Sequence, residues 1–241
     1  MRADLYLVEK GIVSSRQKAK TLIEEGKVFA DGKQVTKASQ NLNDEDIEIR
    51  GEILPYVSRG GLKLKAAIDT FDIEVKDMIC LDVGASTGGF TDCLLQHGAK
   101  KVYAVDCGHG QLDKKLLCDE RVINIEGCNA RDISDEIIPE KVDVCVMDVS
   151  FISQTLIHSA IASLMKSDAL FVTLIKPQFE VGRSNIGKNG IVKDDKVRRF
   201  AIDKVIESCS ANGFSYIGHI DSPIKGGDGN TEFLAVFKYL L

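Results

Sequence analysis

The residues best suited to chemistry are a glycine-rich run at residues 82–90 and a carboxylate, Asp106, that stands 24 positions after Asp82. The run continues an apolar stretch, residues 79–83, that predicts a buried strand. Glycines let the backbone pass close beneath a ligand, and the start of a helix presents free N–H groups to it. Asp106 ends the next predicted strand, where its carboxylate can accept hydrogen bonds from both hydroxyls of a ribose. The pattern therefore predicts a site for a nucleoside-like cofactor.

Three classes of cofactor compete for this turn. The dinucleotide fingerprint has glycine at its first, third and sixth positions, but Ser86 stands at the third. A P-loop ends in Gly-Lys-Ser or Gly-Lys-Thr, which Gly89-Phe90-Thr91 does not supply. S-adenosylmethionine carries an ammonium and a sulfonium but no phosphate, so Asp82 would attract it and repel a diphosphate. We therefore predict S-adenosylmethionine, held by Asp82, Gly84, Ala85, Ser86, Thr87, Gly88, Gly89, Phe90 and Asp106; the alternative is a purely structural turn.

The elements that must position this turn alternate between strands and helices. Apolar runs at residues 101–106, 142–148 and 169–175 predict further strands, and the helical stretches between them imply a mainly parallel sheet covered on both faces. Two last runs, residues 214–220 and 232–239, have only a turn region between them and predict an antiparallel pair. The fold class is therefore α/β, with a Rossmann-like domain.

The first fifty residues predict a separate, small α+β unit. A first helix that ends at Gly11 and a second that is capped by Ser14 or Ser15 and ends at Gly26 form a helical hairpin. The predicted apolar faces of the two helices are Leu5, Val8 and Ile12 in the first and Ala19, Leu22 and Ile23 in the second.

Basic residues concentrate in this unit. Residues 1–40 carry eight Lys or Arg against five Asp or Glu, and the rest of the chain reverses the balance. After the helices, residues 27–35 predict a hairpin that turns at Asp31-Gly32, and residues 46–50 predict one more strand. Four basic side chains on or near the second helix either follow a phosphate backbone or are merely solvated: Arg16, Lys18, Lys20 and Lys27.

Composition excludes several classes of protein. With 44% hydrophobic and 28% charged residues, the chain is an ordinary globular protein, and no apolar run reaches the about 18 to 20 residues of a membrane span. The N-terminus lacks a signal pattern, so we expect a cytoplasmic protein with no membrane partner. Seven cysteines without C-x-x-C spacing predict buried free thiols, and four scattered histidines predict no metal site.

Several motifs resemble known families. Residues 14–33 resemble the small RNA-binding domain named for a ribosomal small-subunit protein. The rest resembles the FtsJ-like ribose methyltransferases, and the whole chain is similar to the TlyA family of ribosomal RNA 2′-O-methyltransferases, on residues 56–64, the glycine turn, and residues 147–152, 174–180 and 227–233. The resemblance implies a seven-stranded sheet, ribosomal RNA or ribosomal subunits as partner, and three parts: an RNA-binding domain at residues 1–50, a linker at 51–57 and a methyltransferase domain at 58–241.

The resemblance also implies a catalytic tetrad of Lys63, Asp148, Lys176 and Glu232. Methyl transfer to a ribose hydroxyl is an in-line displacement by a weak nucleophile, so the hydroxyl proton must be taken or shared. Burial and the neighbouring cation Lys63 would favour a neutral Lys176 that acts as general base. Asp148 and Glu232 would instead favour a charged Lys176 that stabilises the developing alkoxide. The sequence leaves both versions open.

Other contacts and other functions remain as alternatives. Asn129 and Asp132 stand where this fold usually places an adenine contact, or form a plain loop. Arg59, and Arg183 and Lys188 in a glycine-bearing loop at residues 182–190, either contact RNA phosphate or are solvated. The competing functions are a non-catalytic RNA-binding or ribosome assembly factor and a membrane-active haemolysin, the older name in this family. A haemolysin would require an amphipathic pore segment, which the sequence lacks.

Overall fold

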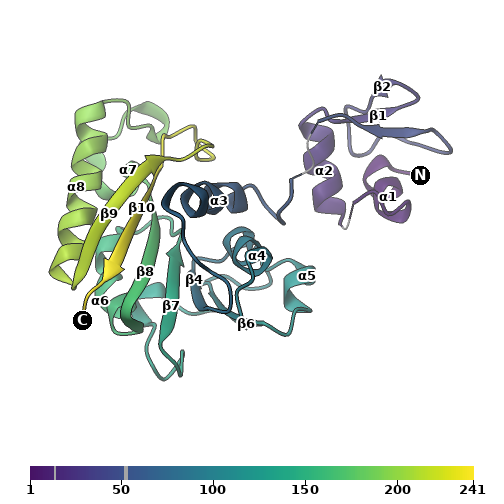
Figure 1. Cartoon of the computed structure of the whole chain (residues 1–241). Helices are drawn as coiled ribbons and strands as arrows, with labels where there is room; N and C mark the ends of the chain where they lie inside the picture. Colours follow the sequence, from purple (N-terminus) through teal and green to yellow (C-terminus); the bar gives the residue numbers. More distant parts are fainter. Residues whose placement is uncertain (14, 52–53) are drawn as a thin grey trace. The chain divides into compact units, whose positions relative to one another are not determined.

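The computed structural model describes residues 1–13, 15–51 and 54–241, and the chain divides into two compact units, Met1–Pro55 and Tyr56–Leu241 (Figure 1). Two sequence expectations lie outside the described residues: Ser14 as a helix cap, and residues 52–53 of the expected linker. The alternative cap is present, because the Ser15 side chain accepts a hydrogen bond from the Lys18 backbone N–H.

The first unit packs two helices against a small antiparallel sheet. The helices are α1 (Ala3–Glu9) and α2 (Arg16–Glu24), and the sheet has the order β2 (Lys33–Gln34), β1 (Val28–Ala30), β3 (Ile47–Ile49). Ala30 pairs with Lys33 across the predicted Asp31-Gly32 turn, so the expected hairpin is confirmed. The predicted apolar face of α2 is also buried, and Gly26 follows the helix with a positive φ.

The predicted apolar face of α1 is only partly correct, because Val8 and Ile12 pack against the core of this unit but Leu5 does not. Leu5 is 37% exposed, whereas Ala3, Tyr6 and Leu7 are buried. A helix of seven residues offers two apolar sets with helical spacing, so spacing alone cannot choose between them. The buried side is fixed instead by Asp4, whose fully buried carboxylate accepts hydrogen bonds from Arg2 Nε at 3.0 Å and Arg16 Nη2 at 2.8 Å. The two guanidinium groups hold the pKa of the Asp4 carboxyl far below its usual range.

The second unit is built on one seven-stranded sheet, with strand order β6-β5-β4-β7-β8-β10-β9. All neighbouring pairs are parallel except those of β10, which runs antiparallel to β8 and β9, as predicted for the last two runs. The strands are β4 (Ile79–Val83), β5 (Lys101–Val105), β6 (Val122–Ile125), β7 (Val142–Met147), β8 (Met165–Ile175), β9 (Phe214–Asp221) and β10 (Phe233–Tyr239). The apolar runs did not identify β6, because this edge strand is only half buried.

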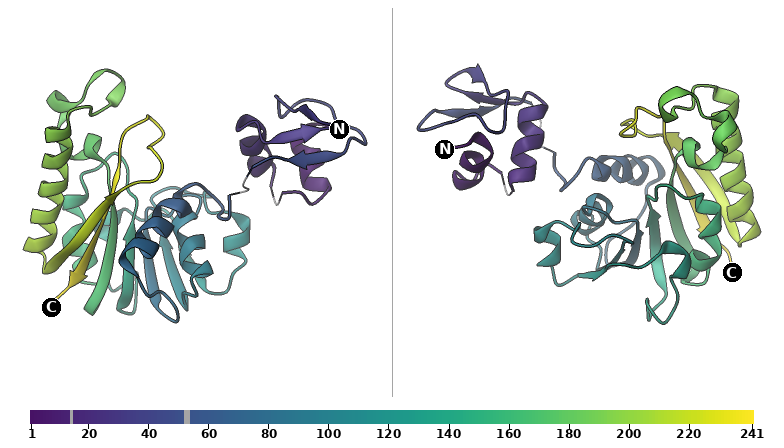
Figure 2. Two further views of the ribbon diagram at one scale, coloured as in Figure 1. Left: turned by 45° about the horizontal axis from the view of Figure 1, so that its top comes forward. Right: turned by 180° about the vertical axis from the view of Figure 1, so that it is seen from behind.

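Helices cover both faces of this sheet (Figures 1 and 2). One face packs against α3 (Gly60–Phe71) and α4 (Gly89–Gln96), and the other against α6 (His158–Ala162) and α8 (Asp195–Ala211). Successive residues of the strands alternate between the two cores, with Val144 and Val146 on the α3 side and Cys145 and Met147 on the α8 side. The remaining short helices are α5 (Lys114–Leu117), α7 (Pro177–Glu180) and the 3-10 turns Ala130–Asp132, Gln154–Leu156, Arg183–Asn185 and Lys188–Gly190.

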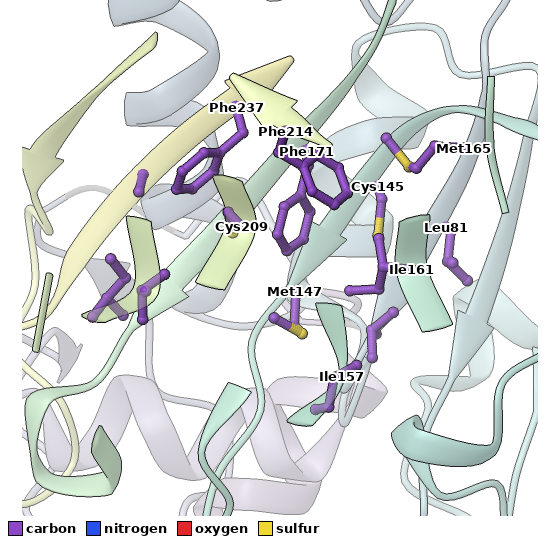
Figure 3. Packing of buried hydrophobic residues seen from close by; sticks show 14 of the residues in the cluster. Leu81, Cys145, Met147, Ile157, Ile161, Met165, Phe171, Cys209, Phe214 and Phe237 are labelled. Carbon is purple, nitrogen blue, oxygen red and sulfur yellow. The ribbon is translucent and has the colours of Figure 1, made fainter. Parts of the chain in front are cut away.

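Aromatic packing is concentrated on the α8 side of the sheet. The ring centroid of Phe171 lies 5.3 Å from that of Phe214 and 6.0 Å from that of Phe237, beside the buried thiol of Cys209 (Figure 3). Four of the seven free cysteines are buried as expected, but Cys107 and Cys118 are exposed. Across the described part of the chain, no helix has the length and apolarity to cross a membrane.

The topology brings the chemistry-bearing residues to one edge of the sheet. Strand order reverses at β4, so a crevice forms beyond the carboxyl ends of β4, β5 and β7, where α/β sheets bind their ligands. Asp106, Asp148 and Lys176 directly follow β5, β7 and β8. Phe233 pairs with Ile175, so Glu232 enters the sheet opposite Lys176.

Asp82 lies inside β4 and is fully buried. Its Oδ2 atom accepts a hydrogen bond from Thr91 Oγ1 of α4 at 2.6 Å, which ties the strand to the helix that follows the glycine turn. Among the described residues, no partner reaches its Oδ1 atom. Burial raises the pKa of Asp82 to about 7, from an ordinary value of 3.8, because the charged form is disfavoured away from water.

This burial predicts a pH dependence of stability. The folded protein keeps a proton that the unfolded chain releases, so the stability due to protonated Asp82 is full below about pH 4 and is lost as the pH rises through about 7. Between pH 5 and 8, the free energy of unfolding of the wild type should fall by about 2 to 3 kcal/mol more than that of Asp82→Asn, measured by urea unfolding followed by circular dichroism. Asp77→Asn, at an exposed position, should follow the wild type. Equal slopes for the wild type and Asp82→Asn would contradict the assignment.

Candidate active site

The glycine turn between β4 and α4 is shaped by close backbone contacts. Gly84 has φ +85°, and a Cβ atom there would lie 2.4 Å from the carbonyl oxygen of Asp148. Gly88 has φ +92°, and a Cβ atom there would lie 2.1 Å from Leu116 Cδ1. Ser86 between them also has a positive φ, of +49°, which is unfavourable for a residue other than glycine. The glycines are therefore required by packing as well as by access to a ligand.

Asp106 supports this turn and faces a cavity. Its two carboxylate oxygens accept hydrogen bonds from the backbone N–H groups of Ser86, at 2.8 Å, and of Gly108, at 2.7 Å. The cavity beside it has a volume of about 700 Å³, within the usual range for a small-molecule site. We call it the cofactor pocket; its lining includes Gly84, Ser86, Asp106, Cys107, Gln111, Asn129, Arg131, Asp148, Phe151 and Leu156.

A second cavity, of about 340 Å³, adjoins the cofactor pocket and shares Gly84, Ser86, Asp148 and Ser150 with it. We call it the tetrad pocket, because Lys63, Asp148 and Lys176 line it. Its other lining residues include Ser58, Arg59, Gly60, Ala85, Thr87, Gly89, Phe90, Ile224, Lys225 and Gly227. A reacting group in the tetrad pocket would therefore lie next to a ligand in the cofactor pocket.

The four predicted tetrad residues form two ion pairs. Lys63 Nζ of α3 lies 2.6 Å from Glu232 Oε2, and the two side chains are 11% and 3% exposed. Lys176 Nζ lies 2.5 Å from Asp148 Oδ1 and donates a hydrogen bond to Ser150 Oγ at 2.7 Å. Glu232 is not itself part of the pocket lining and reaches the pocket through Lys63. Each ammonium group is thus held by its own carboxylate.

Some predicted cofactor contacts lie elsewhere. Asp82 lines neither pocket, because its carboxylate is sealed beneath the turn by its contact with Thr91. Asn129 lines the cofactor pocket and also caps the turn Ala130–Asp132 by accepting a hydrogen bond from the Arg131 N–H. Asp132 is absent from both linings, as is Gly88, which faces Leu116.

The predicted RNA contacts are similarly divided. Arg59 lines the tetrad pocket, whereas Arg183 and Lys188 line neither pocket. In the first unit, Arg16 is hydrogen-bonded to Asp4, and Lys27 forms an ion pair with Glu25 at 2.8 Å. The side chains of Lys18 and Lys20 are partly exposed on α2.

Several residues at the site were not assigned from the sequence, among them Ser150, which accepts a hydrogen bond from Lys176. Lys225 lines the tetrad pocket, and Phe151 lines the cofactor pocket with a 92% exposed side chain and a φ of +64°. The Phe151 ring lies 5.3 Å from that of Phe179. The available signal was position: Phe151 stands three residues after Asp148 in a motif already quoted for its family likeness.

Comparisons with known proteins agree with this geometry. Residues 56–239 match the model of the FtsJ-like methyltransferase family, and residues 1–47 match the model of the S4 domain. Hemolysin A of Brachyspira hyodysenteriae is 48% identical, over 98% of this chain and 99% of its own. The 16S/23S rRNA (cytidine-2′-O)-methyltransferase TlyA of Mycobacterium tuberculosis is 40% identical, over 96% of this chain and 87% of its own.

A solved structure named "Putative hemolysin from Streptococcus thermophilus" superposes with a TM-score of 0.80 at 41% identity, covering all of this chain and 88% of that one. The matched regions contain both pockets and all four tetrad positions. The chain therefore belongs to the FtsJ-like methyltransferase family and carries an S4 domain at residues 1–47.

Proposed function

We propose that this protein is an S-adenosylmethionine-dependent enzyme that methylates the 2′-hydroxyl of a ribose in ribosomal RNA. The observation that carries the proposal is the contact of Lys176 with Asp148 and Ser150 in a pocket that opens beside the cofactor pocket. The name of the Mycobacterium tuberculosis relative, which is 40% identical, supports the same reaction and the same class of RNA. We place the reaction in the cytoplasm, on ribosomal subunits or their RNA.

The cofactor pocket has the features that a nucleoside ligand requires. Asp106 offers carboxylate oxygens to ribose hydroxyls, Asn129 lies in the adjoining wall, and the N-terminus of α4 opens at the glycine turn. The lining includes the apolar side chains of Val105, Ile152 and Leu156, which suit the faces of a purine ring. When bound, S-adenosylmethionine would supply an electrophilic methyl group on a sulfonium.

Lys176 and Asp148 would handle the hydroxyl proton. Lys176 is 11% exposed and Asp148 is 23% exposed, so the pair is only partly solvated. We propose that Lys176 takes the proton of the ribose hydroxyl and gives one to Asp148, so that the ribose oxygen would be free to accept the methyl group that S-adenosylmethionine supplies. Lys63, held by Glu232, would orient the ribose and balance the developing negative charge on its oxygen.

Phe151 provides a surface for the target base. A base whose ribose enters a small pocket must leave its stack, and an exposed aromatic ring can replace the lost stacking. Phe151 is almost fully exposed and lies three residues after Asp148. It is therefore placed to hold the target nucleotide while its hydroxyl reaches Lys176.

The organisation into RNA binding by residues 1–50, a linker and methyl transfer by the second unit remains part of the proposal, but the expected linker at 51–57 is too long, because the compact second unit begins at the buried Tyr56 and not at residue 58. Lys18 and Lys20 on α2 are the basic side chains of the first unit that we assign to RNA, because Arg16 is engaged by Asp4 and Lys27 by Glu25. Arg59 and Lys225 would meet RNA phosphate at the tetrad pocket.

The first prediction from the proposed function concerns Lys176→Ala. Loss of the amine removes the group that holds and moves the proton, so transfer of labelled methyl to ribosomal subunits from cells without this protein should fall at least about 100-fold. Binding of S-adenosylmethionine, measured by calorimetry, should stay within about threefold of the wild type. Lys166→Ala, which breaks an ion pair with Asp143 at the other end of β8, should retain activity. Lost cofactor binding in Lys176→Ala would refute the role.

The location of the label separates the proposed function from its rivals. Label recovered as a 2′-O-methyl nucleoside supports the methyltransferase. RNA binding without label would favour a non-catalytic assembly factor, and lysis of erythrocytes by the purified chain would favour a haemolysin.

The second prediction concerns the cofactor. Asp106→Ala removes the acceptor for the ribose hydroxyls and the support of the Ser86 N–H, so the Kd of S-adenosylmethionine should rise at least about tenfold by calorimetry. Asp113→Ala is the matched control, because Asp113 also accepts a backbone N–H, that of Lys115, but lines neither pocket. An unchanged Kd in Asp106→Ala would exclude this binding mode.

The third prediction concerns the first unit. Replacing Lys18 and Lys20 together by Ala should weaken RNA binding and reduce the dependence of log Kd on log salt by about 1 to 2, because up to two phosphate contacts are lost. Filter binding of ribosomal RNA fragments at several salt concentrations measures both quantities. Lys37→Ala, at an exposed position outside α2, should leave the slope unchanged. If the double variant keeps the wild-type slope, Lys18 and Lys20 do not contact RNA phosphate.

A further inference from the structure

Glu180 is a buried carboxylate that the proposed reaction does not use. It ends α7, four positions after Lys176, and is 5% exposed. Its oxygens accept hydrogen bonds from Ser153 Oγ at 2.5 Å and from the Gln154 backbone N–H at 2.9 Å. Lys204 Nζ of α8 lies 3.2 Å from Glu180 Oε2 and supplies a compensating charge. A buried acid with so many partners connects three separate segments of the chain.

Gln154 connects to the chain on the other side of Lys176. Its side chain is 2% exposed; Oε1 accepts a hydrogen bond from Thr173 Oγ1 at 2.6 Å, and Nε2 donates to the Leu174 carbonyl oxygen at 3.4 Å. Lys176 lies between β8 and α7. Thr173 and Leu174 come before it, at the end of β8, and Glu180 comes after it, at the end of α7. The segment at residues 153–154 is therefore bonded both before and after the lysine.

Residues 153–154 also form the end of the loop that carries Asp148 and Ser150, the two partners of Lys176. Residues 148–153 leave β7 and contain Asp148, Ser150 and Phe151, and no regular helix or strand is assigned to them. Phe151 in this loop has a positive φ, a conformation that surrounding contacts must maintain. The hydrogen bonds of Ser153 and Gln154 hold the far end of the loop against β8 and α7.

We propose that Glu180 and Gln154 form a positioning clamp that sets the distance between Lys176 and the loop carrying Asp148, Ser150 and Phe151. The proposal rests on the proposed function, because it assigns the clamp to methyl transfer. Neither residue lines the tetrad pocket, so each acts through Lys176 and Asp148 and not on the substrate. Displacement of a catalytic group by about 1 Å costs on the order of 100-fold in rate. A clamp that keeps Lys176 and this loop in place would therefore matter for catalysis.

Glu180→Ala and Glu180→Gln test the clamp. The alanine variant loses every contact of the carboxylate, whereas glutamine can still accept the Gln154 N–H and contact Ser153 Oγ. The matched control is Asp143→Ala. Asp143 accepts the Ile79 N–H at 2.9 Å and the Lys166 ammonium at 2.7 Å, so it makes contacts of the same kind at the opposite end of the sheet.

The first readout is independent of activity. Acetic anhydride modifies neutral amines, and peptide mass spectrometry reports its rate at each lysine. With Glu180→Ala, release of Lys176 from Asp148 and Ser150 should increase its modification rate at least threefold relative to Lys65 in the same sample. Glu180→Gln and Asp143→Ala should both stay within twofold of the wild type. A Lys176 rate unchanged by Glu180→Ala would overturn the clamp, whether or not the protein proves to be a methyltransferase.

The second readout is the division between kcat and KM. Glu180→Ala should lower kcat at least tenfold, with the KM and Kd of S-adenosylmethionine within threefold of the wild type, and Glu180→Gln should recover kcat to within threefold of the wild type. If the wild type transfers no methyl group, the proposed function is refuted. The clamp is then tested only by the rates at which acetic anhydride modifies Lys176. An active wild type with equal losses of kcat in Glu180→Ala and Asp143→Ala would refute the clamp alone, because both variants would then act only through stability.

Discussion

The site depends on the pairing of charges that the fold has partly removed from water. Lys63 and Lys176 each keep about a tenth of the side chain exposed, and each lies within 2.6 Å of a carboxylate. An unpaired ammonium in such surroundings would lose hydration without compensation. The two pairs therefore have to form together with the fold, and each acid fixes the position of one lysine.

That pairing in turn depends on sheet register. Glu232 enters β10 beside the end of β8 because Phe233 pairs with Ile175, and a shift of one residue would turn its side chain to the other face. Lys63 approaches from α3, which lies on the face that also holds α4 and the glycine turn. Residues separated by 169 positions of sequence thus meet through strand pairing and helix packing.

The sheet and the glycine turn could be predicted because each leaves a local trace in the sequence, whereas the tetrad was taken from the family resemblance and its catalytic role stays a proposal. Strands 79–83 and 142–147 are mostly apolar runs, each interrupted by one aspartate, and Asp106, Asp148 and Lys176 stand directly after such runs. β6 is a four-residue edge strand, Val-Ile-Asn-Ile, that is only half buried, so its short apolar run left a weaker trace. Asp82 was assigned to the cofactor from its charge, although its carboxylate is buried beneath the turn against Thr91. Charge reveals that a group can bind an ammonium, but burial decides whether it can reach one.

Arg16 shows the same limit for RNA contacts. Its position on the polar side of α2 suited a phosphate contact, but its guanidinium donates to the buried Asp4. The partner stands twelve residues earlier, in a helix whose apolar residues fit two faces. Which face of this helix is buried depends on its contacts with the rest of the unit. The spacing of apolar residues along the helix does not predict those contacts.

The close approach of Gly84 to Asp148 explains why cofactor and tetrad can act as one site. A Cβ atom at Gly84 would lie 2.4 Å from the Asp148 carbonyl oxygen, so the glycine turn and the start of the loop at residues 148–153 are in direct backbone contact. The other end of this loop is bonded to β8 and α7 through Gln154 and Glu180. Both ends of the segment that carries Asp148 and Ser150 are thereby fixed, one against the cofactor turn and the other around Lys176. Since in-line transfer requires a methyl donor and an acceptor oxygen at a set separation, contacts that fix both ends of this loop suit the transfer that we propose.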